Sequence, residues 1–155
     1  MGKDISVGLA ALTGYSNFFL SALLDRTVSS VTFAGAISIN PNECIRLQEL
    51  KDRRIRIFSS FEAFYDNLSV DLMIIPTPIQ YYVPHTCFAL EQGSNVLCEK
   101  PICGVVQGIQ TMKNVRDRTG KLVAIGYQWS FSRAIQALKQ DVLKGVFGAP
   151  KSLKA

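Results

Sequence analysis

Asn95-Val-Leu-Cys-Glu-Lys-Pro101 is a short apolar run that ends abruptly in two charged residues and a proline. Such a run is typical of a buried parallel strand, and open α/β sheets bind ligands at the carboxyl ends of these strands. Proline fixes the direction of the chain after the strand, and a Lys-Pro bond adopts the cis form at small cost. Lys100 is therefore the residue best placed for chemistry.

Similar short apolar runs alternate with helical patterns along the whole chain, which predicts an α/β fold with a doubly wound parallel sheet. The expected strands are Ile5–Ala10, Val31–Ile39, Ile55–Phe58, Asp71–Ile75, Asn95–Cys98 and Leu122–Ile125. The expected helices are Gly14–Leu24, Asn42–Arg53, a short helix after Ser59 with Glu62 in a capping box, Pro84–Gln92, Val105–Thr119 and Ser132–Lys144. Gly93, Gly120 and Gly145 suit left-handed helix ends.

Composition bounds the class of protein. The 155 residues are 48% hydrophobic and 19% charged, and they carry a formal net charge of +5. Most of that charge lies from residue 133 onward, where basic residues without interleaved aromatics are typical of a solvated helix face. We therefore expect no nucleic-acid partner. No apolar run approaches the ~20 residues of a membrane span, so no membrane partner is expected either.

The four cysteines predict neither a disulfide framework nor a metal site. Cys44, Cys87, Cys98 and Cys103 form no CxxC pair and no zinc-type spacing with His85, the single histidine. They are expected to be reduced thiols in a cytoplasmic protein. We expect one domain over residues 1–148, and the strand-like residues 149–155 are expected to begin a second domain that is truncated here.

The turn after the first strand occupies the place of a glycine-rich phosphate loop. The positions of the three fingerprint glycines hold Ala11, Thr13 and Ser16, and the only glycine inside the loop is Gly14. A helix amino terminus favours an anion here even without the glycines. The candidate ligands of a dinucleotide are Leu12, Thr13, Gly14 and Tyr15, although a plain strand-to-helix turn explains the sequence about as well.

Two further strand ends supply candidate cofactor contacts. Ser38 stands where NAD-specific folds commonly place an acid, so the choice between NAD and NADP stays open, with a slight lean to NADP. After the fourth strand, prolines hold the chain extended and leave Thr77, Pro78 and Tyr82 to line the crevice. His85 is more often structural than catalytic in such a position.

The order of these features resembles the amino-terminal domain of the glucose-fructose oxidoreductase, inositol dehydrogenase and MocA family. The matching segments are Pro76-Thr-Pro78, Ala89-Leu-Glu-Gln-Gly93, Asn95-Val-Leu-Cys-Glu-Lys-Pro101 and Gly126-Tyr-Gln-Trp-Ser-Phe-Ser132. The resemblance implies a Rossmann-type domain that binds NAD or NADP, with a C-terminal α/β open-sheet domain missing from this chain. Ala11, Thr13, Ser38, Tyr82 and Ser130 depart from the family's usual residues.

The resemblance also implies the chemistry. It implies hydride transfer between a nicotinamide and a sugar, inositol or related polyol, in a protein that is a homo-oligomer at full length. Lys100 would be the catalytic residue that hydrogen-bonds the reacting oxygen. Glu99 would orient Lys100 or touch the nicotinamide side, and Gln128 would contact the cofactor. The alternative is a non-enzymatic regulatory or ligand-sensing relative whose phosphate loop has drifted.

Overall fold

The computed structural model of the chain describes residues 4–25 and 30–152. Six parallel strands form one sheet in the order β3-β2-β1-β4-β5-β6. The strands are β1 (Ile5–Ala10), β2 (Val31–Ile37), β3 (Arg56–Phe58), β4 (Leu72–Ile75), β5 (Asn95–Cys98) and β6 (Val123–Ile125). The expected doubly wound sheet is confirmed, and the strand order reverses between β1 and β4, where such folds form their ligand crevice.

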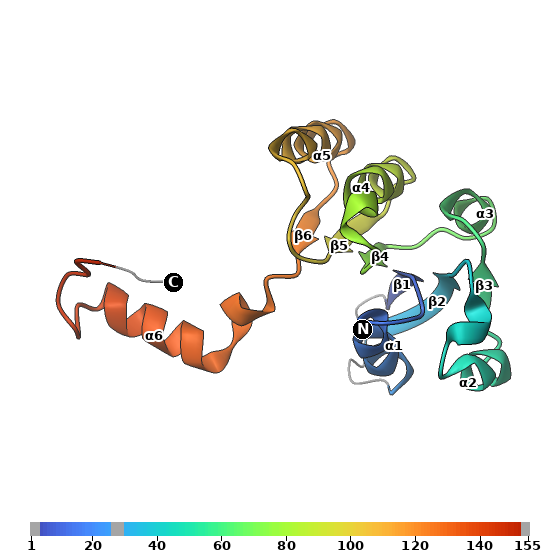
Figure 1. The fold of residues 1–155 in the computed structure, drawn as a ribbon, viewed down its shortest axis with the longest axis horizontal. Coiled ribbons are helices and arrows are strands. Elements are labelled where there is room, and N and C mark those ends of the chain that lie inside the picture. Colours follow the sequence, from blue (N-terminus) through green and yellow to red (C-terminus); the bar gives the residue numbers. More distant parts are fainter. Residues whose placement is uncertain (1–3, 26–29, 153–155) are drawn as a thin grey trace.

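Helices cover both faces of the sheet, with α1 on one side and α3, α4 and α5 on the other (Figure 1). The α-helices are α1 (Ser16–Leu24), α2 (Leu47–Asp52), α3 (Phe61–Tyr65), α4 (Tyr82–Glu91), α5 (Val106–Thr119) and α6 (Arg133–Leu143). Three 3₁₀ turns are η1 (Pro41–Glu43), η2 (Ile79–Tyr81) and η3 (Gln128–Phe131).

Two cores form because successive strand residues point to opposite faces. Leu9 and Ile74 pack with Leu20 of α1, whereas Met73 and Ile75 pack with Leu90 of α4. Both faces of the central strands are thus buried, which is why their sequences are continuous apolar runs rather than alternating ones. The two cores hold the carboxyl ends of β1 and β4 side by side.

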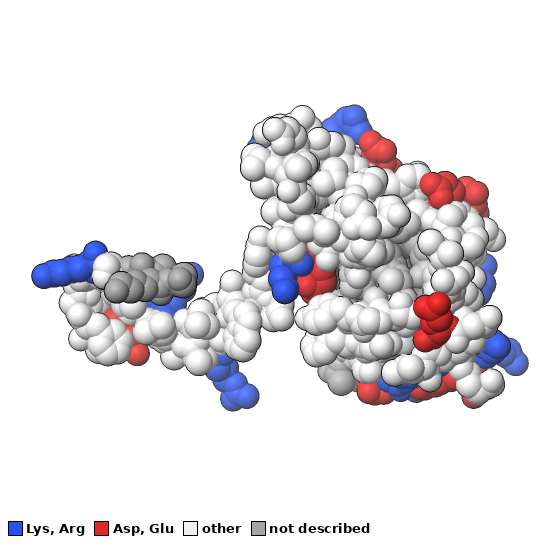
Figure 2. Space-filling model, in the orientation of Figure 1, with Lys and Arg blue, Asp and Glu red and all other residues white. Residues whose placement is uncertain are grey.

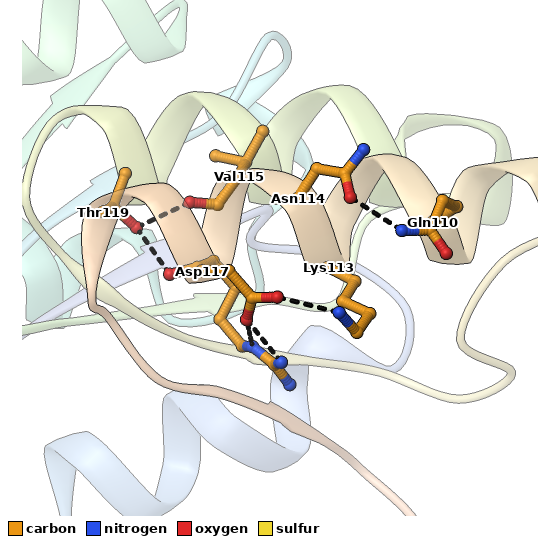
Figure 3. A network of polar contacts seen from close by, with 7 residues as sticks. Gln110, Lys113, Asn114, Val115, Asp117 and Thr119 are labelled. Carbon is orange, nitrogen blue, oxygen red and sulfur yellow. Dashed lines mark hydrogen bonds and ion pairs between the residues drawn. The ribbon is translucent and has the colours of Figure 1, made fainter.

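The solvent side of α5 is a ladder of local polar contacts, drawn in Figure 3. Lys113 pairs with Asp117 at 2.8 Å and Gln110 donates to Asn114 at 2.6 Å, both at the i,i+4 spacing that stabilises exposed helices. The helix ends at Gly120, whose φ of +66° is the left-handed conformation expected from the sequence. Gly93 and Gly145 also have positive φ values, so all three expected helix ends are confirmed.

Several helices and strands begin or end at other residues than expected, and some of these residues lie near the candidate site. The helix expected over Asn42–Arg53 divides into η1 and α2, because Cys44 is extended, with ψ 119°, and buried between them. Strand β2 ends at Ile37, two residues early, while α4 begins two residues before Pro84. The cap of α3 is Ser60 rather than Ser59, and its Oγ accepts from the Ala63 N–H at 3.1 Å.

The segment after β6 leaves the body of the domain, and α6 lies well apart from the sheet (Figure 1). No residue of α6 is buried, in agreement with the expected solvated helix. Figure 2 shows Lys and Arg side chains spaced along this segment rather than gathered into one patch. Residues 149–152 form no helix or strand, and the last three residues of the expected second domain lie outside the described part. Among the described helices, none has the length and hydropathy needed to cross a membrane.

Candidate functional site

A cavity of about 680 Å³ opens at the carboxyl ends of β1, β2, β3 and β4. Its walls come from the turns that follow these four strands and from the first turns of α3 and α4. The lining residues are Ala11, Leu12, Thr13, Ile37, Ser38, Ile39, Asn40, Glu43, Ser59, Ser60, Phe61, Glu62, Thr77, Pro78, Tyr81, Pro84, His85 and Phe88. The cavity therefore lies at the switch point of the sheet, where this architecture binds ligands.

The loop between β1 and α1 contains two residues with positive φ values. Ala11 has a φ of +96° and Gly14 a φ of +62°, and the Ala11 N–H donates to the Ile37 carbonyl at 2.9 Å. Within the described part of the chain, the backbone N–H groups of Thr13, Gly14 and Tyr15 donate to no other residue. Free donors before a helix amino terminus attract anionic groups such as phosphate.

The wall between β4 and α4 is built around the single histidine. The His85 ring stacks on Phe61, with ring centroids 4.2 Å apart, and on Tyr81, at 5.2 Å. Its Nδ1 lies 3.2 Å from Thr77 Oγ1. Burial lowers the pKa of His85, although the carboxylate of Glu62 acts in the opposite direction. The ring is thus neutral at pH 7 and forms a flat apolar wall with a hydrogen-bonded edge.

Two acidic residues also line the cavity. Glu43 reaches the cavity from η1 and Glu62 from the first turn of α3, and both side chains are exposed to solvent. Hydrogen bonds from its own backbone N–H and from the Ser60 hydroxyl lower the pKa of Glu62. The Glu62 carboxylate is therefore ionised at neutral pH.

The end of β5 lies beyond the cavity on the same edge of the sheet. Glu99 is 5% exposed, and its Oε2 accepts from the Lys100 backbone N–H at 3.1 Å. The Lys100–Pro101 bond is cis. The Lys100 side chain is exposed and does not line the cavity, and its ammonium pairs with no carboxylate among the described residues. Glu99 thus contacts the backbone of Lys100, not its ammonium.

Apart from Glu99 and Lys100, the expected cofactor residues divide into those that line the cavity and those that do not. Leu12, Thr13, Ser38, Thr77 and Pro78 line the cavity. Gly14 belongs to the phosphate loop beside it, while Gln128 and Tyr15 meet outside it, where the Gln128 amide lies 3.4 Å from the Tyr15 hydroxyl. Tyr82 does not line the cavity, because it is 6% exposed within the core on the α4 side.

The position of Tyr82 follows from the early start of α4. As the first helical residue it turns inward, and burial raises the pKa of its phenol to about 12. Sequence reasoning also missed Asn40, Glu43 and Glu62 as cavity residues. The acid in the segment Asn40-Pro-Asn-Glu43 was the available signal, and it was hidden because a regular helix was expected from Asn42 onward. Within the described residues, no three metal-ligating side chains come together, and all four cysteines are free.

Residues 7–127 match the profile of the oxidoreductase family with an NAD-binding Rossmann fold. Among curated proteins, the chain is 31% identical over 78 residues to the D-glucoside 3-dehydrogenase of Escherichia coli (strain K12), covering 50% of this chain and 22% of that protein. It is 29% identical over 92 residues to a 1-carboxy-3-chloro-3,4-dihydroxycyclohexa-1,5-diene dehydrogenase of Comamonas testosteroni, covering 59% and 23%. These matches span less than a quarter of each relative.

Solved structures share the fold. The scyllo-inositol dehydrogenase of Lactobacillus casei, solved with NAD(H) and scyllo-inositol, superposes with a TM-score of 0.85 at 22% sequence identity. The superposition covers 94% of this chain and 43% of that one. The myo-inositol 2-dehydrogenase of Lactobacillus plantarum superposes with a TM-score of 0.84 at 19% identity. This chain therefore shares its fold with less than half of each of these proteins.

Proposed function

This chain belongs to the oxidoreductase family with an NAD-binding Rossmann fold, and from that premise we propose that it is the cofactor-binding part of an NAD(P)-dependent oxidoreductase. The reaction is hydride transfer between the nicotinamide and a CH–OH group of a sugar, inositol or related polyol. The observation that carries this proposal is a run of backbone N–H groups, at Thr13, Gly14 and Tyr15, that have no partner among the described residues and lie beside a cavity at the switch point of the sheet.

The residues present suit a dinucleotide. The N–H groups of the phosphate loop would hold the pyrophosphate at the amino terminus of α1. The cavity would take the adenosine half, with Ser38 on one side and the His85 ring on the other. Thr77 and Pro78 would line the path toward the end of β5. The bound nicotinamide supplies the hydride chemistry, and the chain supplies position and charge.

Lys100 is proposed as the catalytic residue. An ammonium beside the reacting oxygen would stabilise the negative charge that develops there as the hydroxyl proton passes to solvent water and the hydride to the nicotinamide. An exposed ammonium at the end of β5, without a carboxylate partner among the described residues, is available to a substrate at that edge. Glu99 fixes the backbone at Lys100 through the hydrogen bond at 3.1 Å.

Whether the phosphate loop binds a nucleotide can be measured with NADH, whose fluorescence reports binding directly. We compare Gly14→Ala with Gly120→Ala, because both glycines have nearly equal positive φ values and open space around the missing Cβ. Both substitutions thus impose the same backbone penalty, but only one lies in the loop. We expect Gly14→Ala to weaken NADH binding at least about tenfold. A change in the loop backbone turns its N–H groups away from the pyrophosphate, and charge-assisted hydrogen bonds are lost. Equal affinities in the two variants would contradict the proposed loop.

A further inference from the structure

We propose that the cavity selects the dinucleotide without a 2′-phosphate, NAD(H), through the carboxylates of Glu43 and Glu62, a preference that rests on the proposed function. With the pyrophosphate at Thr13, the adenosine ribose would lie toward η1 and α3, the two elements that carry these acids. The absence of an acid at Ser38 favoured NADP slightly when the sequence was considered alone. In the structure, Glu43 and Glu62 supply the acidic groups, and neither residue belongs to strand β2.

The charge of the cavity wall opposes a 2′-phosphate. Glu43 and Glu62 are the acids of the wall, and among the described lining residues there is no lysine or arginine. A phosphate monoester carries between one and two negative charges at pH 7, and it is bound by arginine or lysine rather than by carboxylates. The ribose 2′- and 3′-hydroxyls of NAD(H), in contrast, can donate hydrogen bonds to a carboxylate.

Three arginines in the segment from η1 to β3, namely Arg46, Arg53 and Arg56, are already engaged. Arg46, three residues after Glu43, contacts Asp25 at 2.8 Å and Glu49 at 2.7 Å. Arg53 contacts Glu49 at 2.5 Å and donates to the Leu24 carbonyl. On β3, Arg56 donates to the Asn67 carbonyl at 3.2 Å and lies over the Phe58 ring. Recruiting any of them to a 2′-phosphate would break an existing contact.

Local structure explains how both acids reach the wall. The η1 turn is closed by the Glu43 N–H, which donates to the Asn40 carbonyl at 3.2 Å, and Cys44 anchors its end in the core. The turn thereby carries Glu43 past the end of β2 to the cavity. Glu62 is held by the Ser60 cap at the start of α3. The two acids thus come from separate elements and can be replaced independently.

The experiment titrates the 155-residue chain with NADH and NADPH, which carry the same fluorescent nicotinamide. Glu43→Gln, Glu62→Gln and the double variant remove the charges, and Asp66→Asn removes one charge at the end of α3 outside the cavity wall. We expect the wild-type Kd for NADPH to exceed the Kd for NADH by about tenfold or more, because the 2′-phosphate and the carboxylates of the cavity wall repel each other. The double variant should lose most of this ratio, whereas Asp66→Asn should keep it.

Salt gives a second measurement that needs no variant. Raising the ionic strength from about 0.02 M to about 0.5 M screens charge repulsion, so the Kd ratio of the wild-type chain should fall toward one. Three results would overturn the preference for NAD(H) without affecting the proposed function. They are NADPH binding as tight as or tighter than NADH binding, a Kd ratio unchanged in the double variant, and a Kd ratio insensitive to salt. Failure of both nucleotides to bind would instead overturn the proposed function and this preference with it.

Discussion

The Glu99 carboxylate lies directly against Gly126, so that a Cβ at position 126 would stand 2.6 Å from Glu99 Oε1. The Gly126 N–H also donates to the Cys98 carbonyl at 2.8 Å, which ties the ends of β5 and β6 together. A nearly buried carboxylate is costly unless its oxygens keep their partners. The glycine thus leaves Glu99 the room in which it accepts from the Lys100 backbone.

Gly126→Ala should therefore destabilise the domain by about 1–3 kcal/mol, the usual cost of overpacking a filled site. The free energy of unfolding, measured by urea denaturation, checks this. Gly104→Ala is the matched control, because nothing lies within 4 Å of its missing Cβ. Equal midpoints for the two variants would show that Glu99 moves aside without cost.

Lys100→Met should lower turnover by orders of magnitude while leaving cofactor affinity nearly unchanged. The ammonium is proposed to act on the reacting oxygen, and the side chain does not line the cavity. Steady-state kinetics with a polyol substrate measure turnover, and NADH titration measures cofactor affinity. Both are carried out on enzyme whose wild-type form is active. Lys51→Met, an exposed residue of α2, is the control. Unchanged turnover in the Lys100 variant would remove Lys100 from the mechanism.

Ala11→Gly should stabilise the domain, although glycine substitutions usually destabilise. Ala11 has a φ of +96°, a conformation costly for a residue with a Cβ and free for glycine. The relief should exceed the entropy that glycine adds to the unfolded chain and leave a net gain of about 0.5–1 kcal/mol. Ala36→Gly, in the buried part of β2, should lose about that amount. Thermal unfolding of both variants tests the opposite signs.

The sheet was predictable because buried parallel strands leave continuous apolar runs, and all six appear at the expected places. The turn after β1 was predictable by position, but its backbone was not predictable from residue type, since only the structure reveals that Ala11 adopts a glycine-like φ. Tyr82 was expected in the crevice but lies in the core, because α4 begins two residues earlier than expected and the position of a residue in a helix decides which way its side chain points. Glu43 was missed because the turn that carries it depends on the burial of Cys44, a tertiary contact.

His85 predicts a loss of stability on mild acidification. Burial lowers its pKa below the ordinary value of 6.5, so the unfolded chain takes up a proton before the folded chain does. The stability contributed by the neutral ring is complete above pH 6.5 and is lost as the pH falls toward the lower pKa of the folded state. The slope is at most about 1.4 kcal/mol per pH unit, the value for one proton.

Urea denaturation between about pH 7.5 and pH 5 isolates this effect, because His85 is the only histidine and glutamate and aspartate titrate near pH 4. His85→Gln should flatten the slope in this range, since the amide does not titrate. The absolute stability of the variant will be lower, because the stack between Phe61 and Tyr81 is lost, but that loss is independent of pH. A slope that survives in His85→Gln would assign the titration to another group and place the imidazole outside the buried wall.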